Sequence, residues 1–457
     1  MEFPNWVGDP SFNRLVHVSL RACRKCTSLP PLGRLPSLEI LMFEDMSSWE
    51  VWSTNSEAMF PCLRELQIKR CPNLIDVSLE ALPSLRVLRI YECCESVLRS
   101  LVRAASSTTE IEIGSILGLT DEVWRGVIEN FGVMETIKMV SCDEIRYLWG
   151  SDAEVSKVLV NLKELRVWDC KNLVSLGEKE EDEDSIGSNL LSSLRMLYIQ
   201  SCESMERLCC PNSIQSLDIT FCDSLRHVSF PRATTSGGGQ NLKSLNIHIS
   251  GCKNLKSINQ LSHSTHLTSL SISSCQNMEL FSDLHQLSNL TSLYIHGCKS
   301  IESFPNLQLS NLTSLSVHGC KNMKAFGDLQ LPNLIRWWIE DCENLESFPD
   351  LQLSNLTMLK HMYITYCRRI DASFPRGLWP PNLCSLVTGG LKKPISEWGN
   401  QNFPPSLVEL SLYAEPDVRN FSQLSHLFPS SLCWCTCVCT LSVFGLYVND
   451  VQSQSVS

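Results

Sequence analysis

The residues of this chain that could do chemistry are, first of all, its cysteines. The 457 residues include 23 cysteines and ten histidines, and thiolate and imidazole groups serve proteins as zinc ligands and as catalytic nucleophiles and bases. Thirteen of the cysteines recur at one position of a repeated pattern: Cys23, Cys71, Cys93, Cys142, Cys170, Cys202, Cys222, Cys252, Cys275, Cys298, Cys320, Cys342 and Cys367. A repeated position supplies one sulfur per repeat along a line, whereas a zinc site needs four ligands around one point. We therefore predict that these cysteines pack as small, weakly polar side chains, with no metal site and no disulfides.

The sequence lacks the motifs that carry enzyme chemistry. No histidine belongs to an H-E-x-x-H motif, and neither a G-x-S-x-G nucleophile motif nor a G-x-x-x-x-G-K-[ST] phosphate loop occurs. The glycine run at 237–239 is not followed directly by Lys-Ser or Lys-Thr, so it predicts a flexible loop. We expect no catalytic residue, no cofactor and no enzyme activity.

The charge balance also excludes a class of function. The chain has 38 basic and 49 acidic side chains and a formal net charge of -11, whereas nucleic-acid binders neutralise phosphates with clustered Lys and Arg. The N-terminus shows no signal-peptide pattern, so we expect a cytoplasmic location, with the nucleus as the second candidate. The uncharged stretch from Leu427 to Val448 is diluted by Pro429 and by cysteines, so we expect no membrane partner.

The elements that must position the cysteines form a repeat. Aligning the chain on L-x-x-L-x-I-x-x-C-x-x-L gives about 17 units, and successive units begin at Leu290, Leu312 and Leu334. Alternation of apolar and polar residues within each unit predicts a short strand with one buried face. The segment after each cysteine is rich in Asn, Pro, Gly and Ser, which predicts an irregular return. Because no unit can bury its own apolar side, we predict an α/β-type solenoid with a parallel β-sheet on its concave face and mostly irregular or short 3-10 returns on its convex face.

We assign residues 1–426 to this solenoid and residues 427–457 to an atypical apolar tail. After residue 432 another repeat is expected, but CWCTCVCTLSVFGLYV stands there. Its alternating cysteines, at positions 433, 435, 437 and 439, are compatible with a strand edge, an acylation site or a metal-binding tract, and we favour the strand edge. Within the solenoid, the acidic run from Glu178 to Asp184 predicts a loop, because adjacent carboxylates repel one another. We interpret this loop as solvated, with an acidic docking segment as the alternative.

Two stretches of the chain resemble a known family. FPNWVGDPSFNRLVHVSLRACRKCTSLPPLGRLPSLEIL, from Phe3 to Leu41, and FPCLRELQIKRCPNL, from Phe60 to Leu74, are similar to the leucine-rich-repeat region of plant intracellular nucleotide-binding immune receptors of the coiled-coil class. The resemblance covers roughly residues 3–426. It implies a leucine-rich-repeat horseshoe that holds a nucleotide-binding switch domain inactive and detects a pathogen effector or a modified host protein. No residue matches the family's nucleotide-binding motifs, so the expected partners are such proteins, including a switch domain supplied in trans.

The concave face is the candidate binding surface. Residues two, four, six and seven after the first Leu of each unit should face the concavity. Between Leu290 and Cys367 we select eight aromatic or charged residues at these positions. They are Tyr294, His296, Arg336, Trp338, Glu340, His361, Tyr363 and Tyr366. Aromatic residues with interspersed charges are typical of interface hot spots, so we predict a protein-binding site here. The alternative is an ordinary solvated sheet face.

A second, more polar set lies near the N-terminal end, where members of the family would contact their switch domain. It consists of Arg64, Gln67, Lys69, Arg86, Arg89 and Tyr91.

Two other functions remain open at this point. A substrate-recruiting repeat module of a ubiquitin ligase would also bind protein, although its repeats typically have longer, helical returns. A secreted or membrane receptor ectodomain would carry a glycan at Asn420, in one of the N-x-[ST] sequons.

Overall fold

The structure is a computed structural model. It describes residues 3, 5–53, 60–179, 191–211, 213–230, 244–259, 261, 266–278, 284–414, 427 and 429–439. The chain forms two compact units, Met1–Ile301 and Glu302–Ser457, and each is treated by itself. Residues 180–184 of the acidic run, the glycine run 237–239 and Asn420 lie outside the described residues.

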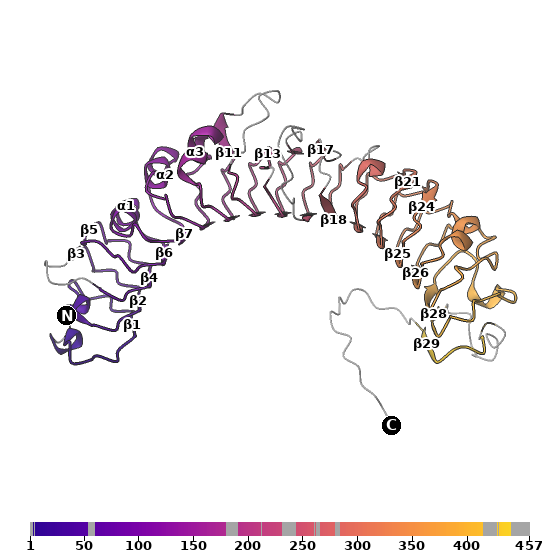
Figure 1. Ribbon diagram of the computed structural model, residues 1–457, viewed down its shortest axis with the longest axis horizontal. Helices are drawn as coiled ribbons and strands as arrows, with labels where there is room; N and C mark the ends of the chain where they lie inside the picture. Colours follow the sequence, from indigo (N-terminus) through magenta and orange to yellow (C-terminus); the bar gives the residue numbers. More distant parts are fainter. Residues whose placement is uncertain are drawn as a thin grey trace. The chain divides into compact units, whose positions relative to one another are not determined.

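The first unit is organised around one parallel sheet. Its strands are β1 (His17–Arg21), β2 (Ile40–Glu44), β4 (Glu65–Lys69), β6 (Val87–Tyr91), β7 (Glu110–Gly114), β8 (Thr136–Val140), β10 (Glu164–Trp168), β12 (Met196–Gln200), β14 (Ser216–Thr220), β16 (Leu245–Ser250), β18 (Leu267–Ser273) and β19 (Ser292–His296). Each strand pairs in parallel with the strand of the next repeat. In this unit the strands run side by side along the inner edge (Figure 1).

The second unit repeats the arrangement. Its strands are β22 (Ser314–His318), β25 (Arg336–Glu340), β26 (His361–Thr365), β27 (Ser385–Gly389), β28 (Glu409–Ala414) and β29 (Trp434–Cys439). They pair in parallel and in order, with Leu315, Trp337, Met362 and Leu386 in register. Strand β29 contains three of the four tail cysteines that we assigned to a strand edge, and it continues the sheet beyond the boundary that we placed at residue 426.

The strands form because their side chains alternate between two environments. In β4, Leu66 and Ile68 are completely buried, whereas the residues between and beside them are half-buried. The same pattern recurs in β2 and β10. Each buried row lies against the row of the next repeat, at the strand spacing of about 4.8 Å. The predicted leucine-rich-repeat solenoid with a parallel sheet is confirmed.

The returns on the other side of each repeat contain short sheets and 3-10 turns. The short sheets pair β3 (Val51–Ser53) with β5 (Asp76–Ser78), β9 (Tyr147–Ser151) with β11 (Ser175–Lys179), β13 (Arg207–Cys209) with β15 (His227–Ser229) and β17 (Ser257–Asn259), β20 (Ser303–Phe304) with β23 (Ala325–Phe326), and β21 (Leu307–Gln308) with β24 (Leu329–Gln330). The 3-10 turns are η1 (Asn5–Gly8), η2 (Leu32–Arg34), η4 (Leu284–Gln286), η5 (Asp350–Asn355) and η6 (Ile395–Glu397).

Among the residues that the structure describes, three returns of the first unit are α-helical, which the composition of the returns did not predict. They contain α1 (Glu95–Ala104), α2 (Asp121–Ile128) and α3 (Asp152–Val158), on the outer side of the unit (Figure 1). Helix α1 buries Val97, Leu98, Leu101 and Val102, a spacing that places four apolar side chains on one helical face. Within the described part of the chain, no helix combines the length and the apolar character needed to span a membrane.

A left-handed residue separates each strand from its cysteine. Arg70, Ser274 and Asp341 have φ of 53°, 54° and 52°, a conformation that non-glycine residues adopt only at a cost. The chain turns there, and the next residue is the buried rung cysteine. Its thiol donates a weak hydrogen bond to the carbonyl two residues earlier, as Cys275 Sγ does to the Ser273 carbonyl oxygen at 3.4 Å.

Burial disfavours the reactive form of the Cys275 thiol. Cys275 is fully buried, and this burial raises the pKa of its thiol well above the ordinary value, with Cys252 and Cys298 adding to the effect. The reactive and metal-binding form of cysteine is the thiolate, which is disfavoured here. Cys275 therefore acts as a small packing residue at the turn.

This packing role predicts a size limit at the rung position. Cys275→Leu should lower the free energy of unfolding by about 1–3 kcal/mol, because extra methylene groups overpack a site without free volume. Cys62 is exposed, so Cys62→Leu is the matched control and should cost less than about 0.5 kcal/mol. Urea denaturation followed by circular dichroism measures both. Equal midpoints for the two variants would show that the rung does not select a small residue.

Candidate functional site

An aromatic pair stands on the solvent face of the second unit's sheet. Trp338 on β25 lies directly opposite Tyr363 on β26, and their rings stack with centroids 4.3 Å apart and planes 25° from parallel. Trp338 is 45% exposed, whereas its neighbour Trp337 is 1% exposed. The alternation of the strand thus places one tryptophan in the core and the other on the surface, as the repeat pattern predicted.

Glu340 lies beside this pair, two residues after Trp338 on the same face of β25. The Trp338 indole Nε1 donates a hydrogen bond to Glu340 Oε2 at 2.9 Å. His318 on β22 brings its Nε2 to 3.8 Å from the same oxygen. The carboxylate therefore holds the indole in place, and its side chain is only 20% exposed.

Two further tyrosines extend the aromatic surface toward the C-terminal end of the unit. The Tyr363 hydroxyl donates a hydrogen bond to the Tyr413 hydroxyl at 3.3 Å, although Tyr413 lies on β28 and Tyr363 on β26. The ring of Tyr366 packs edge-on against Tyr413, with centroids 5.9 Å apart. We call the set Trp338, Glu340, Tyr363, Tyr366 and Tyr413 the aromatic patch. Tyr413 was missing from the sequence prediction, because the row of candidates ended at Cys367.

A glycine pair on the intervening strand makes room for these tyrosines. Gly389 on β27 is in register with Tyr413 on β28, and a Cβ on Gly389 would lie 2.3 Å from the Tyr413 carbonyl oxygen and 2.7 Å from its Cβ. A Cβ on Gly390 would lie 2.8 Å from Cδ1 of Tyr366. Side chains at both positions would collide with the patch, so the two glycines allow Tyr413 and Tyr366 to approach each other.

The surroundings keep the two inner tyrosines protonated. Burial raises the pKa of Tyr363 far above its ordinary value, and the hydrogen bond to Tyr413 and the charge of Glu340 raise it further. Burial also raises the pKa of Tyr366, with Tyr413 and Glu340 contributing. Both phenols therefore present uncharged rings and hydroxyls at neutral pH.

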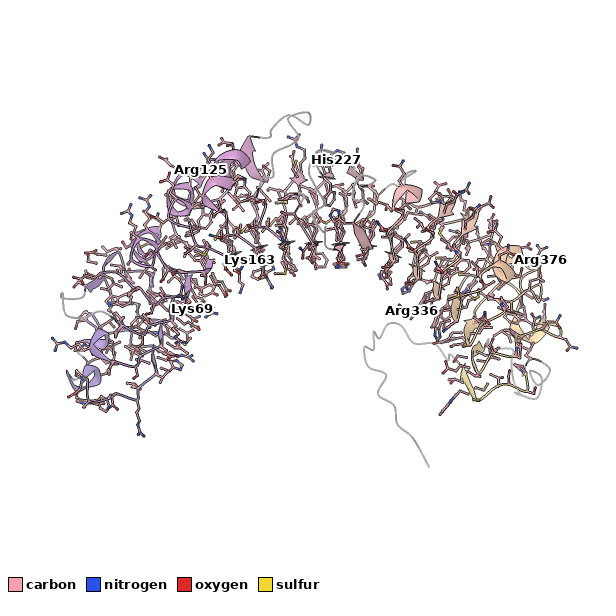
Figure 2. The ribbon with its side chains drawn as sticks, in the orientation of Figure 1. Lys69, Arg125, Lys163, His227, Arg336 and Arg376 are labelled. Atoms are coloured by element: carbon pink, nitrogen blue, oxygen red, sulfur yellow. The ribbon has the colours of Figure 1, made fainter. Side chains whose placement is uncertain are left out.

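The structure brings together only part of the predicted set. Arg336 and His361 pair at the start of β25 and β26, and Figure 2 shows Arg336 among the side chains of the second unit. Tyr294 and His296 lie on β19 of the first unit, so they are not part of the aromatic patch. The binding role of all eight residues stays a prediction.

The second predicted set forms a charged face on the first unit. Lys69 Nζ lies 5.9 Å from the ring centroid of Tyr91, and Arg89 Nε lies 3.5 Å from Glu112 Oε2. Gln67 on β4 is in register with Arg89 on β6 and faces the same side of the sheet. The acidic partners of this face were missing from the prediction.

Arg64 and Arg86, the two remaining members of this set, lie outside its strands. Each precedes its strand by one residue, since β4 begins at Glu65 and β6 at Val87. Arg86 Nη1 donates instead to the Ser107 carbonyl oxygen at 3.1 Å. The two arginines therefore lie just before the strands that carry the other four residues of the set.

Comparisons with known proteins agree with this architecture. The family described as R13L1/DRL21 leucine-rich repeats matches residues 1–46. The disease resistance RPP13-like protein 1 of Arabidopsis thaliana is 29% identical over 210 residues, which cover 37% of this chain and 20% of the relative. The disease resistance protein RGA1 of Solanum bulbocastanum is 24% identical over 157 residues, which cover 28% of this chain and 16% of the relative.

Over the matched residues the chain is similar to plant disease-resistance proteins. The expected resemblance to the repeat region of plant immune receptors is confirmed. This leucine-rich-repeat chain matches at most about a fifth of the length of these relatives. Among solved structures, a leucine-rich-repeat protein of Leptospira interrogans is 16% identical with a TM-score of 0.41, covering 93% of this chain and 97% of its own.

The close approach of Gly389 and Tyr413 yields a stability prediction. Gly389→Ala should lower the free energy of unfolding by more than about 1 kcal/mol, because φ at Gly389 is 151° and the added Cβ meets backbone. A Cβ on Gly399 would meet no neighbouring atom within 4 Å, so Gly399→Ala is the control and should change stability by less than about 0.5 kcal/mol. Thermal unfolding of both variants, with tyrosine near-ultraviolet dichroism, tests the contrast. Equal stability would contradict the close packing.

The raised pKa of Tyr363 predicts a loss of stability at alkaline pH. In the unfolded chain tyrosine ionises near pH 10, whereas folded Tyr363 keeps its proton. Above that pH the unfolded state binds fewer protons, so the free energy of unfolding falls as pH rises. Tyr363→Phe also loses the hydrogen bond to Tyr413, so at about pH 8 it should be about 1 kcal/mol less stable than wild type.

This deficit should shrink as pH rises from about 9 to 11, because the phenylalanine variant has no proton to lose at this position. Urea denaturation across that range measures it. A deficit that stays constant would contradict the raised pKa.

Proposed function

We propose that this chain is a non-catalytic binding region of a plant defence protein, and that the aromatic patch of its second unit binds a protein partner. The partner would be a pathogen effector or a host protein, or a nucleotide-binding switch domain acting in trans. The kinship with plant disease-resistance proteins supports the defence role. The same kinship supports a cytoplasmic location, with the nucleus as the second candidate.

The observation that carries this proposal is the exposed stack of Trp338 on Tyr363. A large aromatic surface left in water costs free energy that burial against a partner would recover. The stack and the hydrogen bond to Glu340 fix the indole in one orientation, so little side-chain entropy remains to be lost on binding. Rigid tryptophan and tyrosine side chains of this kind dominate the energetics of many interfaces.

The test is a two-part substitution with a matched control. Trp338→Ala combined with Tyr363→Ala should abolish binding to partners found in a screen of pathogen effectors and host proteins, since truncating a central hot spot costs about 2 kcal/mol or more. Phe221→Ala removes an exposed aromatic side chain, 58% exposed, from the first unit and should leave binding unchanged. Circular dichroism checks that both variants keep the wild-type spectrum. Full binding by the folded double variant would refute the proposal.

A further inference from the structure

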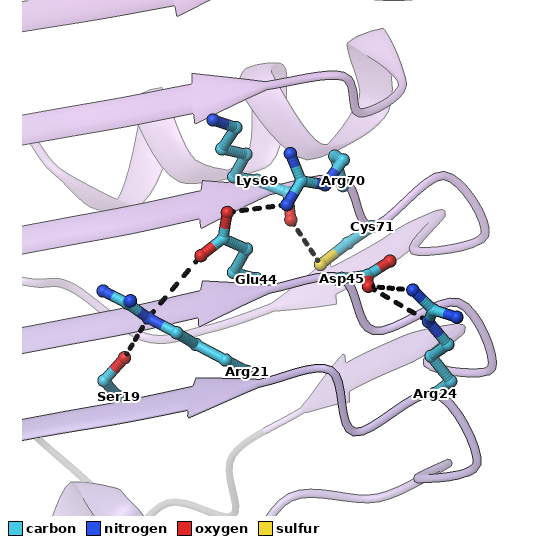
Figure 3. Close-up of polar contacts among 8 residues, drawn as sticks. All are labelled: Ser19, Arg21, Arg24, Glu44, Asp45, Lys69, Arg70 and Cys71. Carbon is cyan, nitrogen blue, oxygen red and sulfur yellow. Dashed lines mark hydrogen bonds and ion pairs between the residues drawn. The ribbon is translucent and has the colours of Figure 1, made fainter.

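Carboxylates on the sheet face of the first unit are neutralised by basic residues of neighbouring strands. Glu44 on β2 lies between Arg21 of β1, at 3.5 Å, and Arg70 beyond β4, at 2.8 Å. Figure 3 shows both contacts, and beside them the ion pair of Arg24 with Asp45. The carboxylates of Glu44 and Asp45 are therefore each paired with a guanidinium already.

The same holds farther along the first unit. Arg89 contacts both Glu65 and Glu112, which lie on the strands to either side. Lys138 Nζ lies 2.6 Å from Glu110 Oε1. Glu44, Glu65, Glu110 and Glu112 of this face are thus each paired with a basic residue from a neighbouring repeat.

Glu340 on β25 differs from these four carboxylates. Within the described part of the chain, no Lys or Arg side chain pairs with it, and His318 approaches its Oε2 only to 3.8 Å. One carboxylate oxygen accepts the Trp338 indole hydrogen bond, which leaves acceptor capacity on the carboxylate. Because the Glu340 side chain is largely shielded from water, its charge attracts a cation more strongly than a fully solvated carboxylate would.

The ring of Trp338 leaves a second contact surface next to Glu340. One face of the indole is covered by Tyr363. The opposite face is turned toward β22, where the residue in register with Trp338 is Ser316. A serine is too small to cover an indole, so an aromatic face and a carboxylate lie side by side above a small residue.

We propose that this slot, formed by Trp338, Glu340 and Ser316, binds a basic side chain of the protein partner, arginine in preference to lysine. The inference deepens the proposed function and rests on it. A cation is attracted to the face of an aromatic ring, most of all tryptophan. A guanidinium can lie flat on the indole while its N–H groups donate to Glu340, and it loses hydration more easily than an ammonium group.

The experiment is a selection of peptides on the full chain. A random 12-residue peptide library displayed on phage is selected on the wild-type protein and, in parallel, on the folded Trp338→Ala variant. Peptides enriched only on wild type are synthesised with a fluorescent label. Their affinity is measured by fluorescence anisotropy against wild type, Glu340→Gln and Glu343→Gln.

Glu343→Gln is the matched control, because it removes the same charge at an exposed carboxylate that pairs with Lys321 at 2.9 Å. We expect the Trp338-dependent peptides to share an arginine. Glu340→Gln should weaken them about tenfold, which corresponds to about 1.4 kcal/mol, and Glu343→Gln less than about twofold. Changing the shared arginine to lysine should weaken binding, and changing it to glutamine should weaken it further.

Two other outcomes separate the failure of this inference from the failure of the proposed function. Trp338-dependent peptides that lack a basic residue, or that bind Glu340→Gln as well as wild type, would overturn the arginine slot and leave the protein-binding surface standing. Enrichment of the same peptides on wild type and on Trp338→Ala would overturn both.

Discussion

The stacking of each repeat on the next is the constraint on which the whole structure depends. A single repeat is too thin to enclose its own leucines, so Leu315, Trp337 and Met362 are buried only because the strands that carry them lie side by side. Backbone hydrogen bonds between parallel strands fix the register at the same time. The inward side chains and the turn cysteine are thereby committed to packing. Chemical variety is left to the solvent face of the sheet and to the returns.

The turn after each strand connects this constraint to the aromatic patch. The residue before the rung cysteine must adopt a left-handed conformation, which is mild for Gly319 but costly for a bulky residue such as Tyr366, with φ of 55°. Tyr366 occupies this position and packs against Tyr413. The Tyr366 side chain thus joins the aromatic patch from a position that the turn holds in a left-handed conformation.

The repeat pattern predicted the strands, the buried rows and the rung cysteines, because the packing of each repeat depends on the same few positions. It did not predict helix α1, since the returns were interpreted by composition, while the apolar face of Val97, Leu98, Leu101 and Val102 follows a helical period. Both Trp338 and Tyr363 were predicted on the concave face, but their stack was not, because it depends on the register of β25 with β26. The contact between Tyr363 and Tyr413 could not be predicted, since it joins residues 50 positions apart across a strand. The contact depends on the space beside Gly389. A search for functional side chains does not consider glycine, because glycine has no side chain.

Carboxylates on the solvent face of the first unit's sheet, such as Glu110, have a basic partner, whereas Glu340 in the second unit has no Lys or Arg partner among the described residues. This difference bears on specificity. Cross-strand pairs such as Lys138 with Glu110 give the face of the first unit charges that already have a counterion, and a charged partner must compete with that counterion. Around Trp338 the apolar area is large, the carboxylate of Glu340 is held by the indole, and a small serine lies opposite. Affinity would come from the aromatic surface, which is tolerant of many partners. Discrimination would come from the single carboxylate, because a partner that buries it without supplying a cation leaves a charge unpaired.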